Sequence, residues 1–268
     1  MNRQQLIEQI RTKRSFLCIG LDTDRSKIPA HLLDEPDPIF AFNRSIIDAT
    51  RDLCVSYKIN TAFYEAEGLV GWTAMQQTLA YIGKEQFVIA DAKRGDIGNT
   101  SEQYARAFFE VLPFDAITIA PYMGSDSVKP FLNWKDKWAI VLGLTSNEGA
   151  ADFELQSLGN EFLFERVLRT ASSWGTNENM MFVIGATRAE SLQEVRKIVP
   201  EHFLLVPGVG AQGGSLSDVY KYGSTKEIGL LVNVSRAVIY ASSGADFAEK
   251  ARSVALAYQQ EMHRLLGS

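Results

Sequence analysis

The chain has 268 residues but only two cysteines and three histidines, and this scarcity limits the kinds of site it can hold. Cys18 and Cys54 both fall in apolar runs, which predicts buried free thiols and a reducing compartment, the cytoplasm. The histidines, His31, His202 and His263, are scattered and lack Cys or carboxylate neighbours at ligand spacing. No metal site is therefore predicted, and a histidine-built zinc site least of all.

The sequence also lacks long apolar runs and an excess of positive charge. No apolar stretch approaches the ~20 residues needed to cross a bilayer, and the charged N-terminal segment shows no signal-peptide pattern. The net charge is −5 and the 27 basic residues are scattered, so neither nucleic acid nor membrane is expected as a partner. Linkers and low-complexity segments are missing too, which predicts one domain over residues 1–268.

A regular alternation of short apolar runs and helical patterns fills the chain. The runs predicted to be strands span residues 16–21, 54–59, 87–90, 116–120, 138–142, 181–185, 203–206 and 230–234. The predicted helices span residues 39–53, 62–82, 100–112, 125–132, 161–174, 188–199, 213–222 and 247–266. Gly68 and Gly71 make an interruption possible in the second helix. Continuously apolar strands alternating with helices indicate a parallel sheet covered on both faces, and eight such units predict an α/β fold, the (β/α)8 TIM barrel.

The densest cluster of charge follows the third predicted strand. Asp91, Lys93 and Asp96 come directly after the run at residues 87–90, with no loop residues between. Because side chains alternate along a strand, Asp91 and Lys93 should point to one face and Arg94 to the other. Most charge clusters at strand ends are solvated loops, but the adjoining core strand favours desolvation here, which is costly unless the charges are used. The motif predicts a reactive site.

Polar residues gather at the ends of the other predicted strands as well. They are Asp22, Thr23, Asp24, Lys58, Asn60, Thr145, Ser146, Asn147, Ser235 and Arg236. In a (β/α)8 barrel the carboxyl ends of the strands form the functional face. These residues are therefore expected to share a site with the charged motif.

A glycine-rich segment at residues 207–214 follows the seventh predicted strand and opens a helix. Glycines let the backbone approach an anion, and the N–H groups at a helix start point at it. Barrels commonly bind phosphate between the loops after strands seven and eight, where Arg236 adds a guanidinium. A plain glycine turn beside a surface arginine is the alternative, but the two features together favour a phosphate site.

The same segment also matches the dinucleotide-binding pattern at Gly208, Gly210 and Gly213. That pattern requires an acid at the end of the next strand, about 20 residues onward. The run at residues 230–234 carries none, so a dinucleotide site is rejected.

Taken together, these motifs resemble the orotidine 5′-phosphate decarboxylase family, in its longer bacterial branch, over essentially the whole chain. The matching segments are residues 91–97 with Thr100, residues 57–60 and residues 207–214. The resemblance implies decarboxylation of orotidine 5′-monophosphate (OMP) to UMP and CO2, the last step of de novo UMP biosynthesis, without a cofactor.

The resemblance further implies that Lys58, Asp91, Lys93 and Asp96 form a charged catalytic network. Lys93 would stabilise the carbanion at C6 of the pyrimidine and then protonate it. A carbanion with no adjacent carbonyl needs such preorganised charge, because the sequence implies no electron-sink cofactor. Asp96 and Thr100 would reach into the neighbouring subunit's site, which implies a homodimer.

Substrate contacts are implied in the same way. Asp22 and Thr100 would bind ribose hydroxyls, while Gln212 and Arg236 would hold the phosphate. Ser146 would contact the pyrimidine. The segment Thr145-Ser146-Asn147 departs from the acid-Met-Ser form of the shorter branch, so Thr145 and Asn147 remain alternatives for that contact. The roles of Asp24, Arg94 and Asn99 stay open.

Two other functions are compatible with part of this pattern. Metal-dependent sugar-phosphate decarboxylases and aldolases of the same suprafamily share the Asp-x-Lys-x-x-Asp strand, but a chelator would abolish their activity. A non-catalytic barrel that binds phosphorylated metabolites would keep the glycine segment and Arg236, but it need not keep the four charged residues together.

Overall fold

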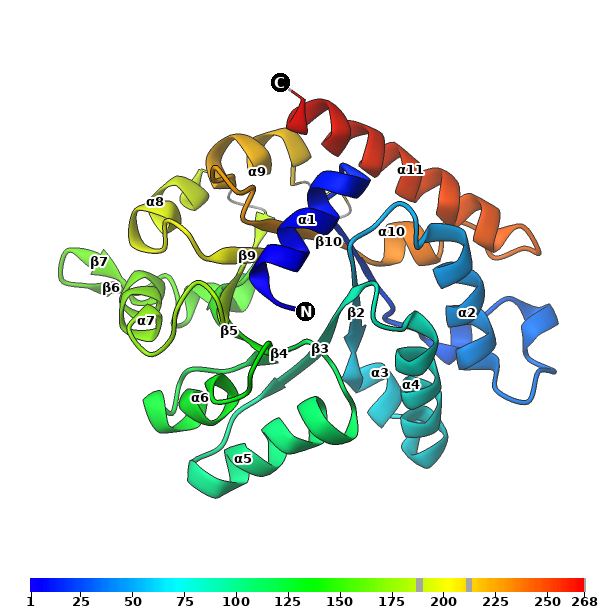
Figure 1. The fold of residues 1–268 in the computed structure, drawn as a ribbon, viewed down its shortest axis with the longest axis horizontal. Coiled ribbons are helices and arrows are strands. Elements are labelled where there is room, and N and C mark those ends of the chain that lie inside the picture. Colours follow the sequence, from blue (N-terminus) through cyan, green and yellow to red (C-terminus); the bar gives the residue numbers. More distant parts are fainter. Residues whose placement is uncertain (187–189, 211–213, 268) are drawn as a thin grey trace.

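The computed structural model describes residues 1–186, 190–210 and 214–267 and has a closed barrel of eight parallel strands at its centre, ringed by helices (Figure 1). The strands, in barrel order, are β1 (Leu17–Gly20), β2 (Ser56–Asn60), β3 (Phe87–Arg94), β4 (Ala116–Ile119), β5 (Trp138–Leu144), β8 (Met180–Ile184), β9 (Phe203–Pro207) and β10 (Leu230–Val234). Strand β10 pairs with β1 and closes the ring. The predicted (β/α)8 barrel is confirmed.

Helices precede, connect and follow the strands, and most of them lie on the outside of the barrel. They are α1 (Arg3–Lys13), α2 (Pro38–Thr50), α3 (Thr61–Glu65), α4 (Gly68–Ile82), α5 (Gly98–Arg106), α6 (Ser125–Leu132), α7 (Leu163–Ser172), α8 (Ser191–Ile198), α9 (Leu216–Gly223), α10 (Arg236–Ile239) and α11 (Phe247–Leu266). Short 3-10 turns lie at Arg25–Lys27, Ala30–Leu32 and Glu148–Ala151, and a π-helical turn at Ala107–Val111 extends α5. No described helix is long and apolar enough to span a bilayer.

The structure refines the predicted helix and strand bounds, and three details are informative. The helix predicted at residues 62–82 divides into α3 and α4 at Gly68, whose φ of +61° favours glycine, so the possible interruption is confirmed. The helix predicted at 161–174 is wrong at its start, because Glu161–Phe162 (β7) pairs with Ser157–Leu158 (β6) in a small hairpin. Cys54 lies before β2 rather than within it, although it is buried.

Helix α1 is absent from the sequence predictions, because it precedes the strand–helix alternation on which they rest. Asn2 caps it, accepting a hydrogen bond from the Gln5 backbone N–H, and this relieves an unpaired donor of the first turn. Leu6 and Ile10 are fully buried beneath it. In Figure 1 the helix crosses the middle of the ring, so it covers one mouth of the barrel.

The barrel interior is packed with large side chains at this same end. Trp138 from β5 meets Phe87 of β3 and Phe203 of β9 edge to face, with ring centroids 6.2 and 6.4 Å apart. All three rings are fully buried. Burial of each such side chain contributes about 1.5–3 kcal/mol. The functional site therefore has to lie at the other end of the strands.

Candidate active site

A cavity of about 310 Å³ opens at the carboxyl ends of the barrel strands. Six of the predicted site residues line it: Asp22, Lys58, Asp91, Lys93, Ser146 and Arg236. Thr145 and Asn147 line it as well, so the structure brings all three candidates for the pyrimidine contact to its wall. The sequence pattern thus located the cavity, on the strand ends where a barrel places its functional groups.

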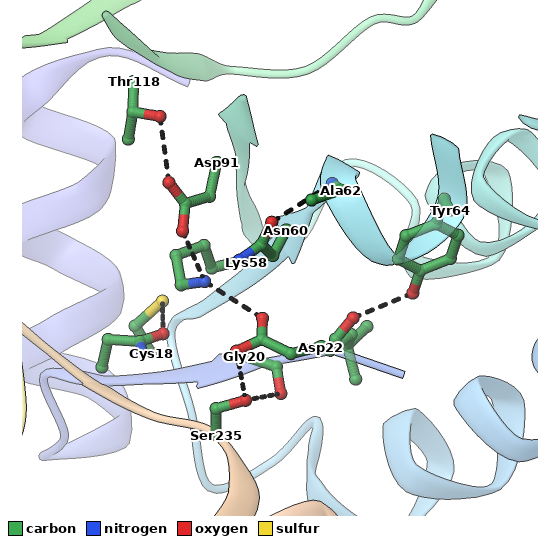
Figure 2. Close-up of polar contacts among 12 residues, drawn as sticks. Cys18, Gly20, Asp22, Lys58, Asn60, Ala62, Tyr64, Asp91, Thr118 and Ser235 are labelled. Carbon is green, nitrogen blue, oxygen red and sulfur yellow. Dashed lines mark hydrogen bonds and ion pairs between the residues drawn. The ribbon is translucent and has the colours of Figure 1, made fainter. Parts of the chain in front are cut away.

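Charged side chains of alternating sign line one part of this cavity, and Figure 2 shows the contacts of Lys58 with Asp22 and Asp91. The Lys58 ammonium lies 2.9 Å from a carboxylate oxygen of Asp91 and 3.2 Å from one of Asp22. The second oxygen of Asp91 lies 2.6 Å from the ammonium of Lys93. Opposite charges alternate along the series Asp22, Lys58, Asp91, Lys93, and each carboxylate of the series is held by a lysine.

Burial and charge oppose one another at the two innermost groups. Burial lowers the pKa of Lys58, but the charges of Asp22 and Asp91 outweigh it and hold this pKa above its ordinary value. Burial raises the pKa of Asp91, but Lys58 and Lys93 outweigh it and hold that pKa well below its usual range. Both groups are therefore ionised at neutral pH.

Hydroxyl groups complete the support of the two carboxylates. The Ser235 hydroxyl lies 2.7 Å from Asp22 and 3.0 Å from the Gly20 carbonyl (Figure 2). The Thr118 hydroxyl donates to Asp91 over 3.0 Å and accepts from the Lys93 backbone N–H over 2.9 Å. Sequence reasoning missed Thr118; its only signal was a hydroxyl in the otherwise apolar run of β4.

Lys93 sits on an unusual piece of backbone. Its φ is +45°, in the left-handed region that non-glycine residues rarely adopt. The pairing of β3 with β4 shifts register between Ala90 and Arg94, and such bulges re-aim side chains next to active sites. The result is a lysine side chain that is 50% exposed at the cavity, whereas that of Lys58 is 6% exposed.

Asp96 and Thr100 lie outside the cavity of their own chain. Asp96 follows β3 and accepts a hydrogen bond from the Ile97 backbone N–H, while Thr100 is exposed in the first turn of α5. Arg94 turns away from the cavity to an ion pair with Glu65. The alternation of Asp91 and Lys93 against Arg94 along the strand matches the sequence prediction.

The glycine segment after β9 forms another part of the wall. Pro207, Gly208 and Val209 line the cavity, and Gly208 has a φ of +97°. Arg236, the first residue of α10, lines the cavity from the neighbouring strand end. Gln212, predicted to bind phosphate, lies outside the described residues.

Other candidate groups have structural roles. The Asp24 carboxylate accepts from the Ser26 backbone N–H and caps a 3-10 turn. Burial raises the pKa of the Cys18 thiol to about 12 and that of Cys54 to about 11, so neither is a reactive thiolate at neutral pH. Across residues 1–186, 190–210 and 214–267, no three or more His, Cys, Asp or Glu side chains cluster as a metal site would require.

Known proteins resemble this chain in sequence and in fold. The profile of the family described as "Orotidine 5'-phosphate decarboxylase / HUMPS family" matches residues 15–251. The chain is 60% identical to the orotidine 5'-phosphate decarboxylase of Flavobacterium johnsoniae, covering 100% of this chain and 99% of the relative. It is 57% identical to that of Bacteroides fragilis, covering 98% and 97%.

Solved structures agree with these sequence matches. The OMP decarboxylase of Leishmania donovani superposes with a TM-score of 0.82 at 35% identity, covering 97% of this chain and 100% of the other. The UMP synthase of the same organism gives 0.84 at 36% identity, and this chain spans 57% of its length. A family match over most of the sequence, joined to whole-length relatives above 50% identity, settles the assignment: the chain belongs to the orotidine 5′-phosphate decarboxylase / HUMPS family.

Proposed function

We propose that this protein is an orotidine 5′-phosphate decarboxylase that converts OMP to UMP and CO2 as the last step of UMP biosynthesis. The observation that carries the proposal is the alternating charge series that ends at Lys93, the half-exposed ammonium on the cavity wall. The names of the full-length relatives support the same reaction.

The proposed step needs one cation and one proton at the same place. The bond from C6 to the carboxylate carbon breaks, its electron pair stays on C6, and CO2 leaves. The Lys93 ammonium stabilises the developing negative charge because it is fixed before the reaction starts. One N–H proton then passes to C6, which gives UMP and a neutral amine that regains its proton from solvent.

The remaining charges hold that lysine and bind the substrate. Asp91 contacts both lysines, so it orients Lys93 while Lys58 balances its charge. Asp22, held by Lys58 and Ser235, is proposed to accept hydrogen bonds from ribose hydroxyls. In this assignment no group needs to change its protonation state before the substrate binds.

The glycine segment and Arg236 are proposed to hold the phosphate, together with Gln212. A guanidinium suits phosphate in two-pronged geometry, and the glycines expose backbone N–H groups. The phosphate is remote from C6, so its binding energy can be directed to the transition state. Removing the phosphate from the substrate is expected to lower kcat as well as affinity.

We further propose a homodimer in the cytoplasm, in which Asp96 and Thr100 complete the site of the partner subunit. Their location beside the strand end but outside their own cavity supports this assignment. A mixed dimer tests this assignment. Asp96→Asn and Lys93→Ala chains are each expected to be inactive alone. In an equal mixture half of the dimers are mixed and each mixed dimer has one intact site, so up to about a quarter of the wild-type activity should return.

The decisive experiment follows the absorbance of OMP with purified protein in EDTA. Rapid conversion to UMP supports the proposal. Absence of both OMP turnover and UMP binding would point to the metal-dependent sugar-phosphate branch of the family. UMP binding without turnover would indicate a non-catalytic barrel.

A further inference from the structure

One part of the cavity wall is held from outside the cavity. Thr145, Ser146 and Asn147 follow β5 and line the cavity, separated from the charged strand β3 by β4. The chain then makes a long excursion, residues 148–162, before α7 begins. Glu154 lies in the middle of that excursion and reaches back to Thr145.

The carboxylate of Glu154 forms hydrogen bonds with both the backbone N–H and the hydroxyl of Thr145. One oxygen accepts the Thr145 backbone N–H over 2.6 Å, and the other lies 2.8 Å from the Thr145 hydroxyl. The carbonyl of Glu154 accepts the backbone N–H of Phe164 in the first turn of α7 over 2.9 Å. A continuous set of hydrogen bonds thus runs from α7 through Glu154 to the cavity wall.

The Thr145 hydroxyl is shared between two acceptors. Its oxygen lies 2.8 Å from a carboxylate oxygen of Glu154 and 2.6 Å from the side-chain oxygen of Asn147, and it has only one hydrogen to donate. Glu154 also accepts the backbone N–H of Thr145, so Glu154 is the residue that contacts both polar groups of Thr145.

Two further features confine the same segment. The pairing of β5 with β8 shifts register between Leu142 and Leu144, a bulge that turns the end of β5. On the other side, a Cβ built on Gly185 would lie 2.9 Å from the backbone nitrogen of Ser146. The segment is held between Glu154 and Gly185, with little room to shift.

We propose that Glu154 is a positioning residue that fixes Thr145, Ser146 and Asn147 as the wall against which the pyrimidine ring is placed. This inference rests on the proposed function. It assigns recognition of the base to a carboxylate that does not itself line the cavity, whereas the phosphate is bound at a different part of the wall.

The test compares Glu154→Gln with Glu165→Gln. Glu165 is a matched control because its carboxylate accepts a backbone N–H from Phe162 over 2.7 Å in the same segment, yet it serves only the start of α7. In Glu154→Gln an amide nitrogen replaces one of the two carboxylate oxygens, so the side chain can accept from only one of the two polar groups of Thr145. The affinities for UMP and for ribose 5-phosphate, measured by calorimetry, are compared with KM and kcat for OMP.

Glu154→Gln is expected to raise the KM for OMP and the Kd for UMP roughly tenfold, as loss of a charged hydrogen bond does. Affinity for ribose 5-phosphate, which has no base, and kcat should change little, and Glu165→Gln should match wild type. An equal loss of ribose 5-phosphate affinity, or no change for UMP, would overturn the inference.

A second variant covers the case in which Glu154→Gln folds poorly. Thr145→Val keeps the backbone bond and removes only the hydroxyl, so it should give part of the same loss. If Glu154 acts through Thr145, the double variant should lose less than the sum of the single variants; additive losses contradict the inference. If the wild-type protein neither turns over OMP nor binds UMP, the proposed function itself has failed, which the wild-type measurement reveals before any variant is made.

Discussion

Each end of the barrel holds a buried cationic side chain, Arg3 at one end and Lys58 at the other, but the partners of the two cations differ. At the amino-terminal end, Arg3 donates to the carbonyls of Asn177 and Glu201 and pairs with Glu227. At the carboxyl-terminal end, lysines and carboxylates contact one another around a cavity.

Arg196 shows the first arrangement most clearly. Its guanidinium donates to four backbone carbonyls, those of Val199, His202, Gly223 and Gly229. Burial lowers its pKa, to about 10, so it still carries its charge at neutral pH. Backbone carbonyls do not titrate, so the hydrogen bonds of Arg196 do not depend on the protonation of its partners. The comparison teaches that cations bound mainly to backbone carbonyls stabilise the fold, whereas cations and carboxylates that contact one another beside a cavity are available for chemistry.

The largest effect should come from Lys93→Ala. Turnover of OMP is expected to fall at least about 10³-fold, because the variant removes both the stabilising cation and the proton donor. UMP affinity, measured by calorimetry, should stay within a few fold of wild type. The exposed Lys135, on the loop before β5, serves as control in Lys135→Ala. Near-normal turnover in Lys93→Ala would remove this lysine as the proton donor.

The converse variant is Arg196→Met at the other end. It leaves four carbonyls without their donor, so the free energy of unfolding should fall by about 3 kcal/mol. The kcat at 25 °C should not change, since this end contributes nothing to the cavity. Denaturant unfolding tests the predicted loss of stability, and steady-state assays on the same preparation test the unchanged kcat. A kcat loss in protein that is still folded would break the division between the two ends.

A pH dependence distinguishes the ends as well. Burial, with Arg196 and Arg3 nearby, lowers the pKa of His202 to about 4 from 6.5. The unfolded chain therefore binds the proton first as the pH falls, and stability is lost between about pH 6.5 and 4. In His202→Phe, whose new ring can pack on Phe182, the free energy of unfolding should fall by about 1–2 kcal/mol less over this pH range than in the wild type. A parallel slope in the variant would show that another group is responsible.

The smallest predicted effect concerns the support of Lys93 at the carboxyl-terminal end of the barrel. Thr118→Val removes the hydroxyl that joins Asp91 to the Lys93 backbone. We expect kcat to fall roughly tenfold, the cost of about one hydrogen bond, with UMP affinity unchanged. Thr73→Val removes an exposed threonine hydroxyl on α4 that bonds only its own helix, and it should leave kcat alone. Wild-type kcat in Thr118→Val would show that the ion pairs alone hold the lysine.

The fold was accessible to sequence reasoning because its strands are buried on both faces. Leu230–Val234 and Phe247–Leu266 match their predicted bounds, since each is a plain apolar or helical pattern ended by polar residues. Helix α1 escaped because it is not part of a strand–helix unit. The hairpin of β6 and β7 was not predicted, because strands of two residues are too short to show an alternating hydrophobic pattern.

The site was only partly accessible. Asp91 and Lys93 are two residues apart in sequence, so the alternation of side chains along a strand predicts that they lie on the same face. Glu154 and Thr145 are nine residues apart across an irregular excursion, and nothing in their spacing indicates contact. Thr118 is one hydroxyl in a strand, and its partner depends on the bulge in β3. Contacts made by irregular backbone have no period, and sequence reasoning cannot find them.

The left-handed backbone at Lys93 has a consequence for how this protein can change over time. A glycine would adopt a φ of +45° at lower cost, by about 1 kcal/mol, so Lys93→Gly should relieve backbone strain, although it also removes the ion pair with Asp91. Selection for an unstrained backbone and selection for the reaction therefore act in opposite directions at this one residue. In a lineage supplied with pyrimidines from outside, we expect this lysine to be among the first site residues to drift, before the arginines that hold the opposite end.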